Sequence, residues 1–212
     1  MANIDSKKNT SVIVLAAGLS KRMGSQNKLH LPINGQAILL HCINGFLDAG
    51  LKDIVVVLGH QHQLSAGLID DLDVTVVVNL DYAKGQISSV RRGLGSVQAS
   101  SNSTFIALGD QPAVSIETID TLLEAFDNRG SAEAIVPYFE AKRGNPILIS
   151  ADARQNILNG KSNFGCRNFI DNNASLVLKI DVCDAGVVTD LDTPTDYQKY
   201  CKRISALESE AN

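Results

Sequence analysis

The stretch VIVLAAGLSKRMG over residues 12–24, followed by Lys28, decides the fold of this chain. It begins with four aliphatic residues, which predict a buried β-strand over 12–15. The chain then enters a loop of small residues that also carries cations. Small residues let backbone N–H groups approach an anion closely, and Lys and Arg side chains add positive charge. The stretch therefore predicts an anion-binding loop at the carboxyl end of a strand, where α/β sheets bind their ligands.

The spacing of the glycines excludes two other phosphate-binding loops. Five residues separate Gly18 from Gly24, whereas a P-loop has four and continues with Gly-Lys-Ser/Thr. The Gly-x-Gly-x-x-Gly fingerprint of dinucleotide-binding proteins is absent as well. We expect the backbone amides over 17–20, together with Arg22 and Lys28, to hold a triphosphate. The alternative, a surface loop that is cationic by accident, does not explain why strand, glycines and cations coincide.

Composition limits the class of protein. At 212 residues and 44% hydrophobic content, the chain predicts one domain over 11–204, between polar, flexible ends at 1–10 and 205–212. A net charge of −4 argues against a general nucleic-acid or membrane surface. No apolar run approaches the ~18 residues of a membrane span, and the N-terminus lacks a secretory signal. The scattered cysteines predict reduced thiols and a cytoplasmic location: Cys42, Cys166, Cys183 and Cys201.

Strand-like and helix-like runs alternate along the chain. This rhythm predicts an α/β fold, a single Rossmann-like domain with a mixed, mainly parallel sheet flanked by helices. The runs around 137–149 resemble a hairpin and predict an antiparallel element. The expected strands are 12–15, 54–58, 74–78, 105–108, 134–137, 146–149 and 176–180. The expected helices are 38–49, 87–97, 116–128, 151–158 and 166–172.

Acidic residues follow the strands in two places. Asp110 comes directly after the 105–108 strand, where a carboxylate is well placed to hold Mg²⁺. It also has an ordinary interpretation, as the start of a turn before Pro112. Asp190 and Asp192 lie on one side of an extended segment and are candidates for a second metal ligand. Thr193 after them predicts a helix N-cap, with Pro194 at the first helical position.

The stretch over 15–28 resembles the signature LAAG-x-S-x-R-M/F-G-x-x-x-K of nucleotidyltransferases related to the molybdenum cofactor cytidylyl- and guanylyltransferases. The resemblance implies a fold of the nucleotide-diphospho-sugar transferase type. It also implies that Arg22 and Lys28 are catalytic and that Asp192, before the Thr-Pro helix start, joins Asp110 at the metal. The residues expected to bind the nucleotide are Leu15, Ala16, Ala17, Gly18 and Ser20.

Further segments extend this resemblance. Gly85, Gln86 and Ser88 match a family segment near the nucleobase, although Ser88 or Ser89 would also serve as a helix cap. Gly144 and Asn145 match an acceptor-side segment that has an equal interpretation as a hairpin turn. Asn163 departs from the family pattern, which has Asp there. His60 and His62 are interpreted as surface residues.

Together these features predict a Mg²⁺-dependent nucleotidyltransferase that moves CMP from CTP to a phosphorylated pterin acceptor of the molybdopterin type, releasing pyrophosphate. A molybdoenzyme client is an additional expected partner, and neither nucleic acid nor a membrane is expected. Alternatives are a GTP-dependent guanylyltransferase, a sugar-1-phosphate nucleotidyltransferase and a non-catalytic molybdenum cofactor carrier. The Ala16-Ala17-Gly18 sequence resembles the cytidylyl branch and favours CTP over GTP.

Overall fold

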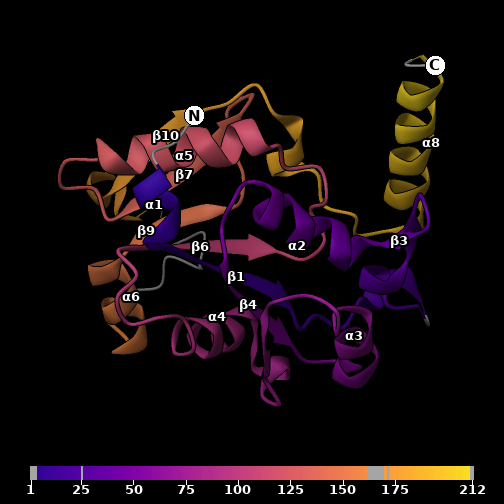
Figure 1. Cartoon of the computed structure of the whole chain (residues 1–212), viewed down its shortest axis with the longest axis horizontal. Helices are drawn as coiled ribbons and strands as arrows, with labels where there is room; N and C mark the ends of the chain where they lie inside the picture. Colours follow the sequence, from indigo (N-terminus) through magenta and orange to yellow (C-terminus); the bar gives the residue numbers. More distant parts are fainter. Residues whose placement is uncertain (1–3, 25, 162–169, 171, 211–212) are drawn as a thin grey trace.

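The computed structural model describes residues 4–24, 26–161, 170 and 172–210. Its centre is one sheet with the strand order β10-β7-β9-β6-β1-β4-β5, in which β8 pairs only with β7 (Figure 1). A two-stranded ribbon, β2 (Pro32–Ile33) with β3 (Gln36–Ala37), lies apart from it. The main strands are β1 (Thr10–Ala16), β4 (Asp53–Leu58), β5 (Thr75–Val78), β6 (Ser103–Leu108), β7 (Ala134–Phe139), β8 (Lys142–Arg143), β9 (Ile147–Ser150) and β10 (Val177–Asp181).

The sheet is mixed and mainly parallel, as the sequence predicts. Strands β5, β4, β1 and β6 form consecutive parallel pairs, and β7 and β10 form another. Strand β9 is antiparallel to both β6 and β7, and β8 is antiparallel to β7, which confirms the hairpin-like region. All seven strands expected from the sequence are present, each with small differences at its ends. The parallel strands thus bring their carboxyl ends to one edge.

Helices cover both faces of the sheet (Figure 1). On one face lie α2 (Ile38–Asp48) and α5 (Ile116–Asp127), and on the other lie α4 (Gln86–Leu94) and α6 (Ala151–Leu158). Strand β1 shows why both faces are needed. Val12, Val14 and Ala16 pack into the first core, whereas Ile13 packs into the second, so alternate side chains point to opposite faces. A strand that is buried on both faces has a continuous apolar sequence.

The structure differs from the sequence expectations at both ends. Residues Ile4–Lys8, expected to be part of a flexible end, form helix α1, and Lys7 pairs with Asp120 of α5 at 2.6 Å. Residues 205–210, expected to be a flexible tail, continue helix α8 (Pro194–Glu210). A polar sequence does not exclude a helix: the ion pair of Lys7 favours α1, and hydrogen bonds between Thr193 and Asp196 favour the start of α8. Helix α3 (His62–Leu68) was also not expected from the sequence, and the 166–172 helix lies largely outside the described residues.

Helix α8 begins where the sequence predicts. The Thr193 hydroxyl accepts a hydrogen bond from the Asp196 backbone N–H at 3.2 Å, and the Asp196 carboxylate accepts one from the Thr193 N–H at 2.9 Å. This reciprocal pair is a capping box with Asp in place of Glu. It fixes the direction in which the segment containing Asp190 and Asp192 leaves the sheet. In Figure 1, α8 stands at the margin of the molecule.

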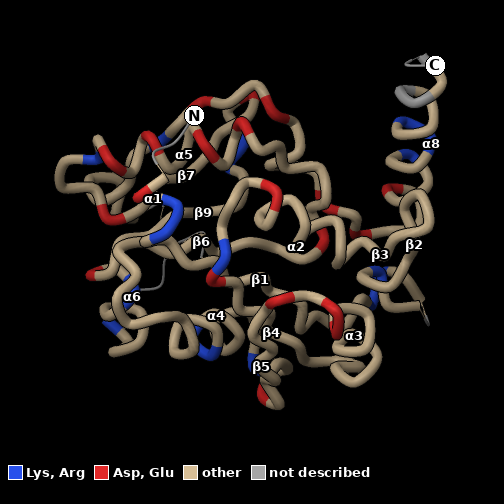
Figure 2. The backbone as a smooth tube through the Cα atoms, viewed as in Figure 1, with Lys and Arg blue, Asp and Glu red and all other residues tan. Residues whose placement is uncertain are grey.

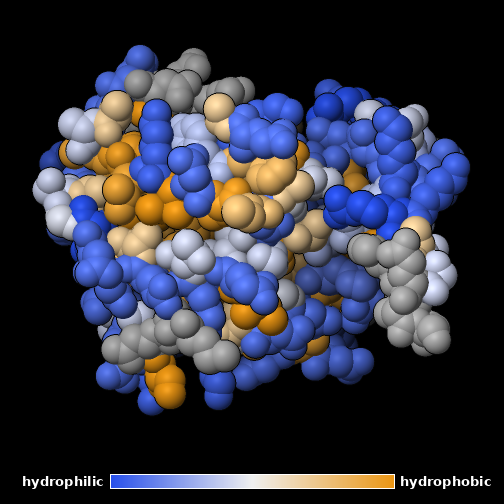
Figure 3. Space-filling model, turned by 90° about the horizontal axis from the view of Figure 1, so that it is seen from above, coloured by the Kyte–Doolittle hydropathy of each residue, from blue (hydrophilic) through white to orange (hydrophobic). Residues whose placement is uncertain are grey.

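The surface fits a chain of modest net charge. Acidic and basic residues are scattered along the backbone (Figure 2), and one face is mostly hydrophilic with hydrophobic side chains showing between the polar ones (Figure 3). Within the described residues, no helix is long and apolar enough to cross a membrane. The described cysteines, Cys42, Cys183 and Cys201, are all free thiols.

Helix α4 packs so closely on the sheet that its glycine is required. A Cβ on Gly93 would lie 2.8 Å from Val57 Cγ2 and 3.1 Å from Ile13 Cγ2, whereas a Cβ on Gly67 of α3 would meet nothing within 4 Å. We expect Gly93→Ala to lower the free energy of unfolding by about 1–3 kcal/mol through overpacking. The matched control Gly67→Ala is expected to be neutral or to stabilise by up to about 1 kcal/mol. Urea unfolding of both variants checks this, and equal effects would contradict the packing.

Candidate active site

A cavity of about 360 Å³ lies at the carboxyl ends of the parallel strands. This size is within the range of small-molecule sites. Four segments far apart in sequence line it, namely the loop after β1, the stretch from Tyr82 into the start of α4, the turn after β6 and the segment before α8. Its lining residues are Leu15, Ala16, Ala17, Gly18, Ser20, Arg22, Lys28, Leu29, Tyr82, Gln86, Ser89, Leu108, Asp110, Asp190 and Asp192.

The loop after β1 has the geometry of an anion-binding loop. Ser20 has a positive φ of 49°, which turns the backbone into a short 3₁₀ helix over Lys21–Met23. Ser20 also accepts a hydrogen bond from the Lys28 N–H at 3.3 Å, which closes the loop. Within the described part of the chain, the N–H groups of Gly18, Leu19 and Ser20 donate to no protein acceptor. Unsatisfied amides beside cationic side chains are suited to bind phosphate oxygens.

Lys28 joins the three segments electrostatically. Its ammonium forms ion pairs with Asp110 Oδ2 and, at 2.7 Å, with Asp192 Oδ1. Arg22, which is 67% exposed, pairs with the other oxygen of Asp192 at 2.7 Å. The structure thus brings together all four of the residues predicted from the sequence to be catalytic or metal-binding.

The Lys28 ammonium identifies a point on which two carboxylates converge. Burial by itself would lower the pKa of Lys28, but the charges and hydrogen bonds of Asp110 and Asp192 outweigh it and raise the pKa above its usual value. The ammonium therefore lies where a metal ion held by both carboxylates would lie. Carboxylate oxygens are suitable ligands for Mg²⁺. No group of three or more His, Cys, Asp or Glu side chains that could hold a metal lies within the described residues. A cation here would thus need further oxygens, such as those of a phosphate.

Asp190 is arranged differently from Asp192. It is exposed at the rim of the cavity, and its Oδ1 accepts a hydrogen bond from Gln111 Nε2 at 2.7 Å. Partial desolvation raises the pKa of Asp190, as do the negative charges of Asp110 and Asp192, while the Gln111 hydrogen bond opposes them. Among the described contacts, Lys28 pairs with Asp110 and Asp192 but not with Asp190. The geometry therefore favours Asp192 as the partner of Asp110.

The start of α4 and the short helix before it contribute Tyr82, Gln86 and Ser89 to the lining of the cavity. Of the residues expected here from the sequence, Gln86 lines the cavity, whereas Gly85 and Ser88 do not. The Ser88 hydroxyl instead donates to the carbonyl of Gly85 at 2.7 Å. Neither serine caps α4, since no side-chain hydrogen bond caps that helix. Tyr82 was missed because a tyrosine in a polar loop has no spacing signal, but its short 3₁₀ helix turns it toward the cavity.

Gly144 and Asn145 do not line this cavity. A Cβ on Gly144 would lie 2.6 Å from Val187 Cγ2, and the Asn145 N–H donates to the Val187 carbonyl at 2.9 Å. Gly144 thus permits close packing on the chain itself, and the turn between β7 and β8 lies at Glu140 and Ala141, not at Gly144 and Asn145. Asn163 lies outside the described residues.

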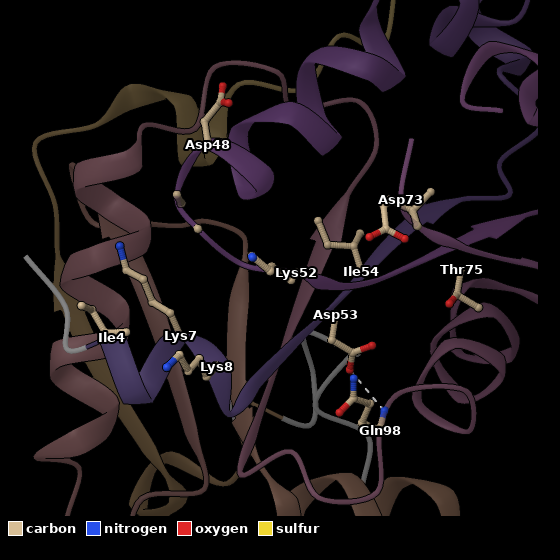
Figure 4. A pocket seen from close by; sticks show the side chains of 13 residues that line it. Ile4, Lys7, Lys8, Asp48, Lys52, Asp53, Ile54, Asp73, Thr75 and Gln98 are labelled. Atoms are coloured by element: carbon tan, nitrogen blue, oxygen red, sulfur yellow. Dashed lines mark hydrogen bonds between the residues drawn. The ribbon is translucent and has the colours of Figure 1, made fainter. Parts of the chain in front are cut away.

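A larger cavity of about 760 Å³ lies at the amino ends of β4 and β5, beside α1 (Figure 4). Two of the charged residues that line it, Lys7 and Asp53, have partners within the protein. Lys7 pairs with Asp120, and Asp53 accepts hydrogen bonds from the Ser11 hydroxyl and from the Gln98 N–H. Ligands of open α/β sheets bind at the carboxyl ends of strands, and of these two cavities the smaller one lies there.

The fold and the site together define a nucleotidyltransferase. The sheet, the anion-binding loop after β1 and the paired carboxylates are all present in one molecule. Residues 12–176 match the model of the MobA-like NTP transferase domain, and the chain belongs to this family.

Two curated relatives and one solved structure are similar to this chain. Nicotine blue oxidoreductase of Paenarthrobacter nicotinovorans is 30% identical over 85% of this chain and 91% of that relative. Molybdenum cofactor cytidylyltransferase of Escherichia coli K12 is 29% identical over 87% of this chain and 92% of that relative. A nucleotidyl transferase from Methanothermobacter thermautotroptrophicus has the same fold, with a TM-score of 0.77 and 22% identity over 93% of this chain and 98% of that chain.

The Lys28 ammonium lies between the two carboxylates that would hold a metal ion, and this position leads to a prediction. In Lys28→Met the two carboxylates lose their shared cation, so Mn²⁺ alone should bind at least about tenfold more tightly than to the wild type. Lys21→Met is the matched control, because Lys21 is exposed in the same loop and should leave the Mn²⁺ affinity unchanged. Free Mn²⁺ is measured by electron paramagnetic resonance during a titration. An affinity of Lys28→Met no higher than that of the wild type would show that the carboxylates do not form a cation site.

Proposed function

We propose that this protein transfers CMP from CTP to a phosphorylated pterin of the molybdopterin type and releases pyrophosphate. The observation that carries the proposal is the convergence of Asp110 and Asp192 on one cation, next to a loop with unsatisfied amides. That combination suits a triphosphate chelated to a divalent metal. The similarity to molybdenum cofactor cytidylyltransferase supports the pterin acceptor, and the Ala16-Ala17-Gly18 sequence supports CTP.

The residues of the chain divide into two groups in this reaction. Asp110 and Asp192 would hold Mg²⁺, which supplies positive charge to the phosphate that is attacked. The amides over 18–20 would bind the triphosphate. With the two carboxylates holding the metal, Lys28 and Arg22 would be free of their ion pairs and available to the phosphate oxygens. Both cations would stabilise the negative charge that develops as pyrophosphate leaves.

The acceptor explains why no general base is needed. A terminal phosphate is already anionic near neutral pH, so it attacks without losing a proton to the protein. Positioning and electrostatic stabilisation are then sufficient for catalysis. Tyr82, Gln86 and Ser89 line the same cavity and would contact the base and ribose of the nucleotide.

Calorimetry with CTP, GTP, UTP and ATP, each with and without Mg²⁺, tests the proposal. We expect selective binding of CTP, and Mg²⁺ should strengthen it. The metal would free Lys28 and Arg22 for the triphosphate, and the triphosphate would free the two carboxylates for the metal. Preference for GTP would indicate the guanylyltransferase alternative with the same metal site. Failure of every nucleotide to bind would contradict the enzyme proposal and favour a cofactor carrier.

Removal of Asp110 should abolish turnover without unfolding the protein. Asp110→Ala leaves Lys28 paired with Asp192, so the ammonium keeps one of its two ion-pair partners. We expect pyrophosphate release from CTP and a phosphorylated pterin to fall by at least about 10³-fold, because metal polarisation is worth several kcal/mol. Asp48→Ala, an exposed carboxylate at the other end of the sheet, is the control. Retained metal-dependent release in Asp110→Ala would refute the site assignment.

A further inference from the structure

The two segments that carry the carboxylates run side by side and are hydrogen-bonded to each other. The Leu191 N–H donates to the Asp110 carbonyl at 3.1 Å. Gln111 Nε2 donates to Asp190 Oδ1 at 2.7 Å and to the Val187 carbonyl at 3.2 Å. We propose that Gln111 and Asp190 are positioning residues, which fix the separation of Asp110 and Asp192 and so the affinity of the metal site. This inference rests on the metal-dependent transfer proposed above.

Close packing further along the contact between the two segments shows that they cannot slide apart freely. A Cβ on Gly186 would lie 2.1 Å from the Ala113 carbonyl oxygen, so the backbones touch there. Asp184 then accepts hydrogen bonds from the Ser115 N–H and the Thr118 hydroxyl, each at 2.8 Å. The two segments are therefore held together at the end away from the site. Nearer the site, the side chain of Gln111 donates two of the hydrogen bonds that join them.

The amide of Gln111 has a defined orientation. Its two neighbours, the Val187 carbonyl and the Asp190 carboxylate, are both acceptors, so the NH₂ group must face them. Gln111 is only 5% exposed, and within the described residues its Oε1 has no hydrogen-bond partner. A buried oxygen without a hydrogen-bond partner costs free energy. The side chain therefore keeps this position because of the two hydrogen bonds that its Nε2 donates, to Val187 and to Asp190.

Asp190 has the corresponding role on the other segment. Gln111 adjoins Asp110 in sequence, and Asp190 is two residues from Asp192. The hydrogen bond between their side chains therefore ties the two metal-binding positions to each other. Groups that hydrogen-bond directly to metal ligands typically change metal affinity by 10–100-fold when they are removed, and a bond between the neighbours of two ligands should act at the lower end of that range.

A double-mutant cycle with Mn²⁺ alone as the probe tests the inference. Asp190→Asn keeps an oxygen that accepts from Gln111, whereas Asp190→Ala removes it, and both variants lose the same charge. Gln111→Met keeps the size of the side chain but removes the donor. Free Mn²⁺ is followed by electron paramagnetic resonance, and thermal unfolding checks that each variant is folded.

If the residues position the site, Asp190→Ala should bind Mn²⁺ about tenfold more weakly than Asp190→Asn. In the Gln111→Met background that ratio should fall to about one, because the hydrogen bond is already lost. Gln111→Met alone should also weaken binding. If Asp190 were itself a metal ligand, Gln111→Met would leave binding equal or stronger, and this result would overturn the inference.

The same titration separates this inference from the proposed function. A wild-type protein that binds no Mn²⁺, either alone or together with CTP, would overturn both. A wild type that binds Mn²⁺ but shows equal ratios in the two backgrounds would overturn the positioning role alone. As a second readout, the variants that weaken Mn²⁺ should regain pyrophosphate release at higher Mg²⁺ concentration, which a general folding defect would not allow.

Discussion

One ammonium group held between two carboxylates joins the parts of this molecule that form its site. Lys28 is separated from Asp110 by 82 positions and from Asp192 by 164, yet it pairs with both. The three residues come from the first loop, from the turn after β6 and from the segment before the last helix. Their meeting requires that the strands preceding the first two lie next to each other. The ion pairs therefore depend on the order of strands in the sheet.

The register of β1 with β6 is the constraint behind that meeting. Leu15 of β1 lies opposite Leu108 of β6, and the Gly109 N–H donates to the Leu15 carbonyl at 3.0 Å. Both strands thus end at the same level, and the two loops begin side by side. A shift of one residue would turn each side chain to the other face of the sheet. The alternating burial of β1 in two cores prevents such a shift.

The local patterns of the sequence were sufficient for the strands and for the charged part of the site. Continuous aliphatic runs predicted every strand of the central sheet except the short β8, and the β1 loop, Asp110 and Asp192 were recognised from strand ends and family motifs. The remaining features depend on tertiary contacts. Ser89, not Ser88, faces the cavity, because Ser88 bonds to the carbonyl of its own helix start. Gly144 packs on Val187, a residue 43 positions away, and no local pattern announces that contact.

The balance of charge in the site explains how it can remain stable without a ligand and still bind one. The cations Lys28 and Arg22 neutralise the carboxylates Asp110 and Asp192, so neither the two like positive charges nor the two like negative charges repel each other strongly. A metal ion or a triphosphate alone must break these ion pairs and leave the opposite charges without partners. The two together satisfy both sets at once. Because such coupling is reciprocal, in the proposed reaction each ligand would strengthen the other's binding, and the site would favour the metal–nucleotide complex over either component.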